Sequence, residues 1–100
     1  MTPPTDAALI SHLESLQRTI ALARLGRSPS RNAAQQALAI LEDVSSQLRW
    51  RGGLENVDLR QARAALVPLT LGHLPQEQAC ILAMRELLFV IFALSDEDTA

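Results

Sequence analysis

The sequence predicts an all-α fold, a small antiparallel bundle of four helices. The chain has 100 residues, which is enough for one domain. Its apolar content of 48% is mostly Ala, Leu, Ile and Val, and Ala and Leu are strong helix formers. Apolar residues recur at intervals of three and four along four segments, which Gly and Pro separate. The connections are short enough to make neighbouring helices antiparallel.

The first helix is expected over about residues 7–25, after an extended lead at residues 1–5 that contains two prolines. Thr5 or Asp6 is suited to cap its start. Gly26 is expected to end it, because glycine adopts the left-handed conformation without steric cost. The predicted inner face consists of Leu9, Leu13, Leu16, Ile20 and Ala23.

The second helix is expected from residue 29 or 30 to Arg51. Ser28 precedes Pro29, and a capping side chain before a proline at the first helical position favours a helix start. Gly52 and Gly53 are expected to stop the helix. Its predicted inner stripe consists of Ala34, Ala37, Leu41, Val44 and Leu48.

The third helix is expected to begin after a cap at Asn56 or Asp58. Pro68 lies inside its apolar pattern, and a proline removes one helical hydrogen bond, so we expect a kink or an end near Val67. A turn around Gly72 follows. The predicted inner face consists of Leu59, Ala62, Leu66 and Leu69.

The fourth helix is expected from Pro75 to Leu94 and forms the central hydrophobic element of the bundle. Between residues 79 and 94 only Arg85 and Glu86 interrupt the apolar sequence. The single helical domain is thus expected over residues 6–94, with an acidic, flexible tail at residues 95–100. The longest uninterrupted apolar run falls well short of the ~18 residues that a membrane span needs, so no membrane association is expected.

The fourth helix also motivates the main functional hypothesis. Its apolar residues point in every helical direction, whereas a helix on the surface of a protein has one apolar stripe. Either the other helices enclose it, or a second chain covers what they leave open. A twofold homodimer is the simplest closed arrangement, and another protein partner is the next. The expected interface residues are Met84, Leu88, Phe89, Phe92 and Trp50.

Trp50 has two interpretations. It stands at the end of the second helix between two arginines. A tryptophan there is more often a lid on the core, yet Trp and Arg are also enriched at interface hot spots.

Nucleic-acid binding is the alternative hypothesis, and it rests on local arginine clusters. All nine basic residues are arginines, and the guanidinium group pairs well with phosphate. Against it, the net charge is −2, and the loop before the third helix is longer than a helix-turn-helix allows. The candidate anion contacts are Arg24, Arg27, Arg31, Arg49, Arg51, Arg60 and Arg63.

Catalytic and metal-binding residues are sparse. His12 and Glu14 diverge on one helix, and a turn separates His73 from Glu77, so no set of metal ligands converges. Cys80 lies among apolar residues, which is typical of a buried structural cysteine. We therefore expect no cofactor, no metal site and no enzymatic activity.

The function predicted from the sequence is a non-catalytic protein–protein interaction module that self-associates through its C-terminal helix. Adaptors, small chaperones, assembly factors and regulators belong to this class. The lone cysteine and the absence of a secretory signal at the start of the sequence favour the cytoplasm. The Ala-, Leu- and Arg-rich composition suggests a bacterial source.

Overall fold

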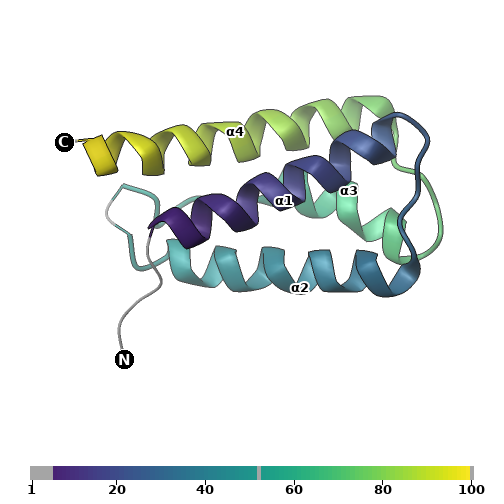
Figure 1. Cartoon of the computed structure of the whole chain (residues 1–100), viewed down its shortest axis with the longest axis horizontal. Coiled ribbons are helices and arrows are strands. Elements are labelled where there is room, and N and C mark those ends of the chain that lie inside the picture. Colours follow the sequence, from purple (N-terminus) through teal and green to yellow (C-terminus); the bar gives the residue numbers. More distant parts are fainter. Residues whose placement is uncertain (1–5, 52, 100) are drawn as a thin grey trace.

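The described part of the chain folds into four α-helices. The computed structural model describes residues 6–51 and 53–99, with side chains for residues 7–51 and 53–95. The helices are α1 (Asp6–Arg24), α2 (Arg31–Leu48), α3 (Arg60–Thr70) and α4 (Glu77–Thr99), and consecutive helices run in opposite directions (Figure 1). The described residues contain no strand. The prediction of an all-α, four-helix antiparallel bundle is confirmed.

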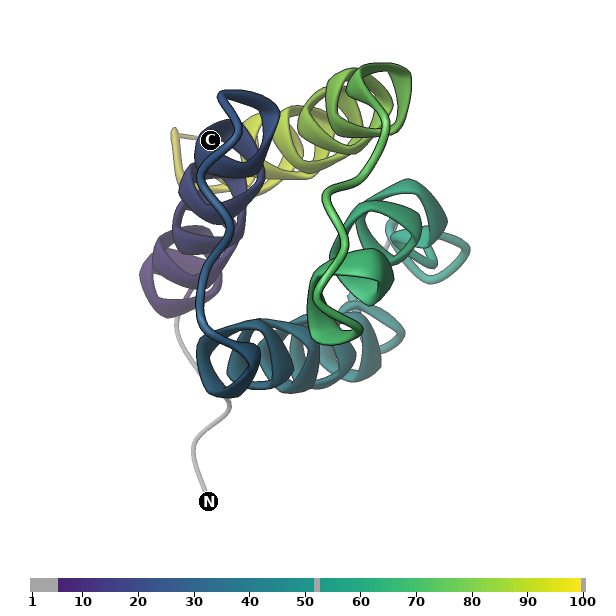
Figure 2. The same ribbon diagram turned by 90° about the vertical axis from the view of Figure 1, so that its right-hand side faces the viewer.

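The helices stand at the four corners of the bundle when it is viewed end-on (Figure 2). α1 packs against α2 and α4, and α3 also packs against α2 and α4. α2 and α4 are therefore diagonal to each other. Each helix has one side toward the core and another toward solvent, and α4 occupies a corner like the rest.

The core is built from the inner stripes that the sequence predicts. Every predicted inner residue of α1, α2 and α3, together with Leu59 just before α3, is buried. Regular spacing of three and four is sufficient to identify them, because it places side chains on one helical face. The contribution of α4 consists of Cys80, Ala83, Leu87, Val90 and Leu94.

Gly26 and Gly72 end α1 and α3 in the same way. Their φ angles are +87° and +80°, in the left-handed region. After α1, the Gly26 N–H donates to the Ala23 carbonyl and the Arg27 N–H donates to the Leu22 carbonyl. The same pair of bonds follows α3 and satisfies the last carbonyls of that helix. The expected role of Gly26 is confirmed.

The boundaries of α2 differ from the expected ones. Ser30, rather than Ser28, is its N-cap: the Ser30 hydroxyl accepts a hydrogen bond from the Ala33 N–H, and the Ser28 hydroxyl donates to the Pro29 carbonyl instead. Pro29 therefore precedes the cap. The helix ends at Leu48, before Arg51, because turn bonds already link the next residues to Gln47 and Leu48.

α3 begins and ends differently from the expectation. It is short, with 11 residues, and it continues through Pro68 to Thr70, so of the expected alternatives the end near Val67 is wrong. A proline in the last turn removes only one helical bond, and the Pro68 carbonyl still accepts the N–H groups of Leu71 and His73. At the start, Leu59 has a left-handed backbone with φ +51°, and the Asp58 carboxylate accepts the Arg60 N–H at 3.1 Å.

α4 is displaced toward the C-terminus relative to the expectation. It begins at Glu77 instead of Pro75 and continues beyond Leu94 to Thr99. The expected tail at residues 95–100 therefore lies largely within this helix. The expected lead at residues 1–5 lies outside the described residues.

Candidate interaction surface

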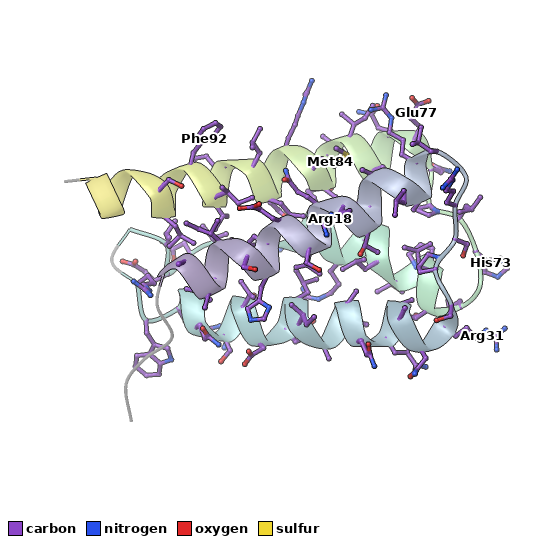
Figure 3. The ribbon with its side chains drawn as sticks, in the orientation of Figure 1. Arg18, Arg31, His73, Glu77, Met84 and Phe92 are labelled. Carbon is purple, nitrogen blue, oxygen red and sulfur yellow. The ribbon has the colours of Figure 1, made fainter. Side chains whose placement is uncertain are left out.

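α4 has a solvent-exposed apolar face. Leu88, Phe89 and Phe92 are 43%, 62% and 60% exposed, although they belong to the most apolar helix of the chain. Figure 3 shows Phe92 directed away from the other three helices. Arg85, one turn before Phe89, is exposed beside them. We call these four residues, Arg85, Leu88, Phe89 and Phe92, the α4 outer face.

The face exists because, among the described residues, α4 packs mainly against two helices, α1 and α3. α1 contacts one flank of α4, where the Gln17 amide donates to the Met84 carbonyl at 3.2 Å. α3 contacts the opposite flank, where the Glu86 carboxylate accepts the Ala62 N–H at 3.0 Å. A helix with apolar residues all round then leaves one apolar side uncovered. The other helices do not enclose α4.

The two charged residues that interrupt α4 have different surroundings. Glu86 is half-buried and caps the N-terminus of α3 through the Ala62 N–H. A carboxylate at that end of a helix is also favoured by the helix dipole. Within the described ranges, Arg85 has neither a hydrogen-bond nor an ion-pair partner. Arg85 is therefore an unpaired positive charge next to two exposed phenylalanines.

Met84 and Trp50, two of the expected interface residues, lie outside this face. Met84 is half-buried and packs against the core on the α1 side of α4. Trp50 is 89% exposed, so it is not a lid on the core. It follows α2, the helix diagonal to α4, and lies in an open depression with Arg49, Arg51 and Glu55. The bundle does not bring Trp50 to the α4 outer face.

The candidate anion contacts divide between the two ends of the bundle. Ion pairs hold Arg24 to Glu77 at 3.1 Å, Arg60 to Asp58 at 3.3 Å and Arg63 to Glu42 at 2.8 Å. The hydrogen bond from Arg63 to Glu42 raises the pKa of the guanidinium. The Arg24 pair links α1 to α4 and the Arg63 pair links α2 to α3, whereas Arg60 pairs with a residue just before its own helix.

Arg27, Arg31 and Arg49 have no ion-pair partner among the described residues. The Arg31 guanidinium lies against the turn after α3: its Nη2 atom is 3.5 Å from the point that a Cβ on Gly72 would occupy. Figure 3 shows Arg31 and His73 at the same end of the bundle. Arg49 belongs to the loop at the opposite end. The eleven residues between Leu48 and Arg60 do not make a helix-turn-helix.

No metal-binding group of three His, Cys, Asp or Glu residues occurs in the described part of the chain. His12 is exposed on α1, and His73 is exposed in the turn before α4. Cys80 is fully buried, and burial raises the pKa of its thiol even though the nearby Arg24 acts to lower it. Its surroundings are those of a structural cysteine.

Exposed leucines at the turns are a feature that the sequence analysis did not single out. Leu25, Leu71 and Leu74 are 76%, 62% and 50% exposed at the end of the bundle where α1 and α3 finish. All three lie outside the predicted inner faces. Each stands directly before a glycine or a proline in the sequence, and this position could have identified them as turn residues. Leu25 also borders a depression between α1 and α4.

α4 is long and apolar enough, by length and composition alone, to cross a membrane. The segment Glu77–Ser95 has a mean hydropathy of 1.8. The sequence-based expectation of no membrane association rested on the longest apolar run, which Arg85 and Glu86 interrupt. A membrane-spanning helix, however, tolerates a few charged residues. In the bundle 28% of this segment is buried, including Cys80, Leu87 and Leu94, which belong to the core.

Comparisons with known proteins find no relative of this chain. No protein family, curated protein or solved structure matches it.

Proposed function

We propose that this protein is a non-catalytic interaction module that associates with a second copy of itself through the α4 outer face. The observation that carries the proposal is the exposure of Leu88, Phe89 and Phe92 on a helix whose other sides are packed. Apolar side chains gathered on one surface are a typical mark of an interaction site. A twofold arrangement covers such a patch with its own copy and closes without further assembly.

The size of the patch predicts the strength of the association. Two phenylalanines and a leucine at about half exposure present on the order of 300 Å² of apolar surface. A standard interface buries about 800 Å² on each partner. We therefore expect a reversible dimer whose population falls on dilution.

Light scattering on a sizing column, over a range of protein concentrations, tests the proposal. Two chains per particle at high concentration, falling toward one on dilution, is the expected result. Phe89→Asp and Phe92→Asp should each shift the particle to one chain, because an unpaired carboxylate in an apolar interface is strongly unfavourable. Leu25→Asp is the matched control, since it makes the same kind of change at an exposed leucine away from the face. A wild-type monomer at every concentration would refute the proposal.

Nucleic-acid binding ranks below self-association. Arg24, Arg60 and Arg63 are already engaged by carboxylates, and the remaining cations belong to separate ends of the bundle. Salt-dependent binding to generic duplex DNA would revive this alternative.

A further inference from the structure

We infer that the second copy packs on the α4 outer face in an antiparallel orientation, with the two α4 helices related by a twofold axis near residues 90 and 91. This inference rests on the proposed self-association and adds to it the direction and register of the contact. Three observations carry it: the spacing of the face, the unpaired charge of Arg85, and the acidic sequence that follows Phe92.

The spacing matches a helix–helix seam. Arg85, Phe89 and Phe92 follow one another at intervals of four and three, and the next position in this series is 96. α4 is helical through Thr99, so all four positions belong to one continuous helix. Intervals of four and three place residues along a single seam that a second helix can follow. The sequence at the end of this seam is Asp96-Glu97-Asp98.

The seam matches itself when one copy is reversed. Turning a second α4 about an axis between Val90 and Ile91 brings Phe89 opposite Phe92 of the second copy, and Phe92 opposite its Phe89. The same operation brings Arg85 opposite position 96, where the sequence has Asp. Both ends of the contact then join opposite charges, and the aromatic residues meet at its centre.

A parallel arrangement lacks this match. It would bring Arg85 next to Arg85 of the second copy, and the acidic sequence next to its own copy. Charges beside a helix–helix seam set the orientation of the partners by this kind of attraction and repulsion. Negative charge at a helix C-terminus is also unfavourable in an isolated chain. An arginine from the second copy would offset that cost.

A distance measurement between two copies of one label distinguishes the orientations. Gln78→Cys introduces an exposed thiol near the start of α4, outside the predicted contact, whereas the native Cys80 is buried. In the antiparallel dimer the two labelled positions lie about 40 Å apart, from a rise of about 1.5 Å per residue. In a parallel dimer they lie about 10 Å apart. Spin labels read by pulsed electron resonance measure this separation, and wild-type protein treated with the same reagent is the control.

Charge exchange supplies the second readout. Arg85→Asp should weaken dimerisation roughly tenfold, because it replaces two attractive contacts by repulsive ones. Adding Asp96→Arg to the same chain should restore the wild-type dissociation constant to within about threefold. Arg18→Asp makes the same charge change on α1, at an exposed arginine that has no ion-pair partner among the described residues, and should leave dimerisation unchanged.

The outcomes separate this inference from the proposed function. A long distance between labels together with rescue by the exchanged pair supports both. A short distance in a dimer that Phe89→Asp disrupts overturns the antiparallel register and leaves the proposed function intact. A dimer that neither phenylalanine variant affects, or a monomer at all concentrations, overturns both. A monomer that instead floats with lipid vesicles also overturns both and assigns the α4 outer face to a membrane surface.

Discussion

Burial lowers the chemical reactivity of the Cys80 thiol, because the reactive thiolate form is disfavoured in apolar surroundings. The thiol is fully buried, and burial raises its pKa. In the unfolded chain the thiol titrates near ~8.5. Because the folded pKa is the higher one, the folded state binds more protons in alkaline solution, so its stability decreases as the pH rises above the unfolded value.

This leads to a pH prediction. Chemical denaturation followed by circular dichroism should show the free energy of unfolding of the wild type falling between neutral pH and pH ~10. In Cys80→Ala the part of this decrease that belongs to the thiol should be absent. A thiol reagent should modify the folded wild type slowly and the denatured protein rapidly. Equal slopes for the two proteins, or fast modification of the folded state, would contradict the assignment.

Gly26 provides a residue-scale test of backbone conformation. Its φ is +87°, and apart from its two chain neighbours no described residue has an atom within 4 Å of an added Cβ. The cost of Gly26→Ala is therefore conformational rather than steric crowding, and we expect a loss of about 1–2 kcal/mol in the free energy of unfolding. Gly26→Asn should lose less, because asparagine tolerates the left-handed region. Thermal and urea unfolding measure both variants, and equal losses would argue against this explanation.

The N-terminus of α3 is capped by a side chain that belongs to another helix. α3 has no side-chain cap from Leu59, its N-cap residue, and instead receives acceptors from Asp58 and from Glu86 on α4. Glu86 thereby joins two helices that meet in the bundle. This role explains why a carboxylate stands within the apolar middle of α4.

Glu86→Ala should lower the free energy of unfolding by about 1–2 kcal/mol, because it removes a helix cap and leaves the Ala62 N–H without that acceptor. Glu14→Ala is the matched control, since Glu14 is exposed on α1 and should change stability by less than ~0.5 kcal/mol. Hydrogen exchange at Ala62 gives a local readout, with faster exchange expected in the Glu86 variant. Unchanged exchange there would contradict the capping role.

Prediction from the sequence succeeded best where a single periodic pattern determines which residues are buried. The inner stripes, such as Leu9 to Ala23 in α1, were predictable because burial of a helical face requires that spacing. The N-cap of α2 was not, since Ser28 and Ser30 have the same capping chemistry and only the fold selects between them. Glu86 and Ala62 are far apart in sequence, so their contact depends on how α3 and α4 pack.

The same reasoning applies to the candidate site. The all-round apolarity of α4 left two arrangements open, complete enclosure by the other helices or an uncovered apolar part. The exposure of Leu88, Phe89 and Phe92 corresponds to the second of them. Which flank of α4 faces α1 and which faces α3 could be learned only from the structure, and that packing leaves Met84 half-buried on the α1 side. Trp50 could not be assigned from sequence, because a tryptophan after a helix can turn inward or outward with equal local geometry.

At the scale of the whole molecule, the square arrangement keeps distant surfaces independent. α2 and α4 are diagonal (Figure 2), so a change beside α2 should not be felt on the α4 outer face. Trp50→Ala should therefore leave the particle mass at each concentration unchanged, while Phe92→Asp lowers it. Light scattering of the two variants side by side tests this, and a loss of the dimer in Trp50→Ala would place the second copy over a wider surface.

The exposure of Trp50 has a spectroscopic consequence. It is the sole tryptophan of a chain without tyrosine, and it is 89% exposed. Its fluorescence should resemble that of the free amino acid in water, with strong quenching by iodide and little spectral change on unfolding. The fluorescence of Trp50 therefore does not report on changes in the core or at α4. A blue shift of the emission would report that a ligand or a second copy covers the loop between α2 and α3.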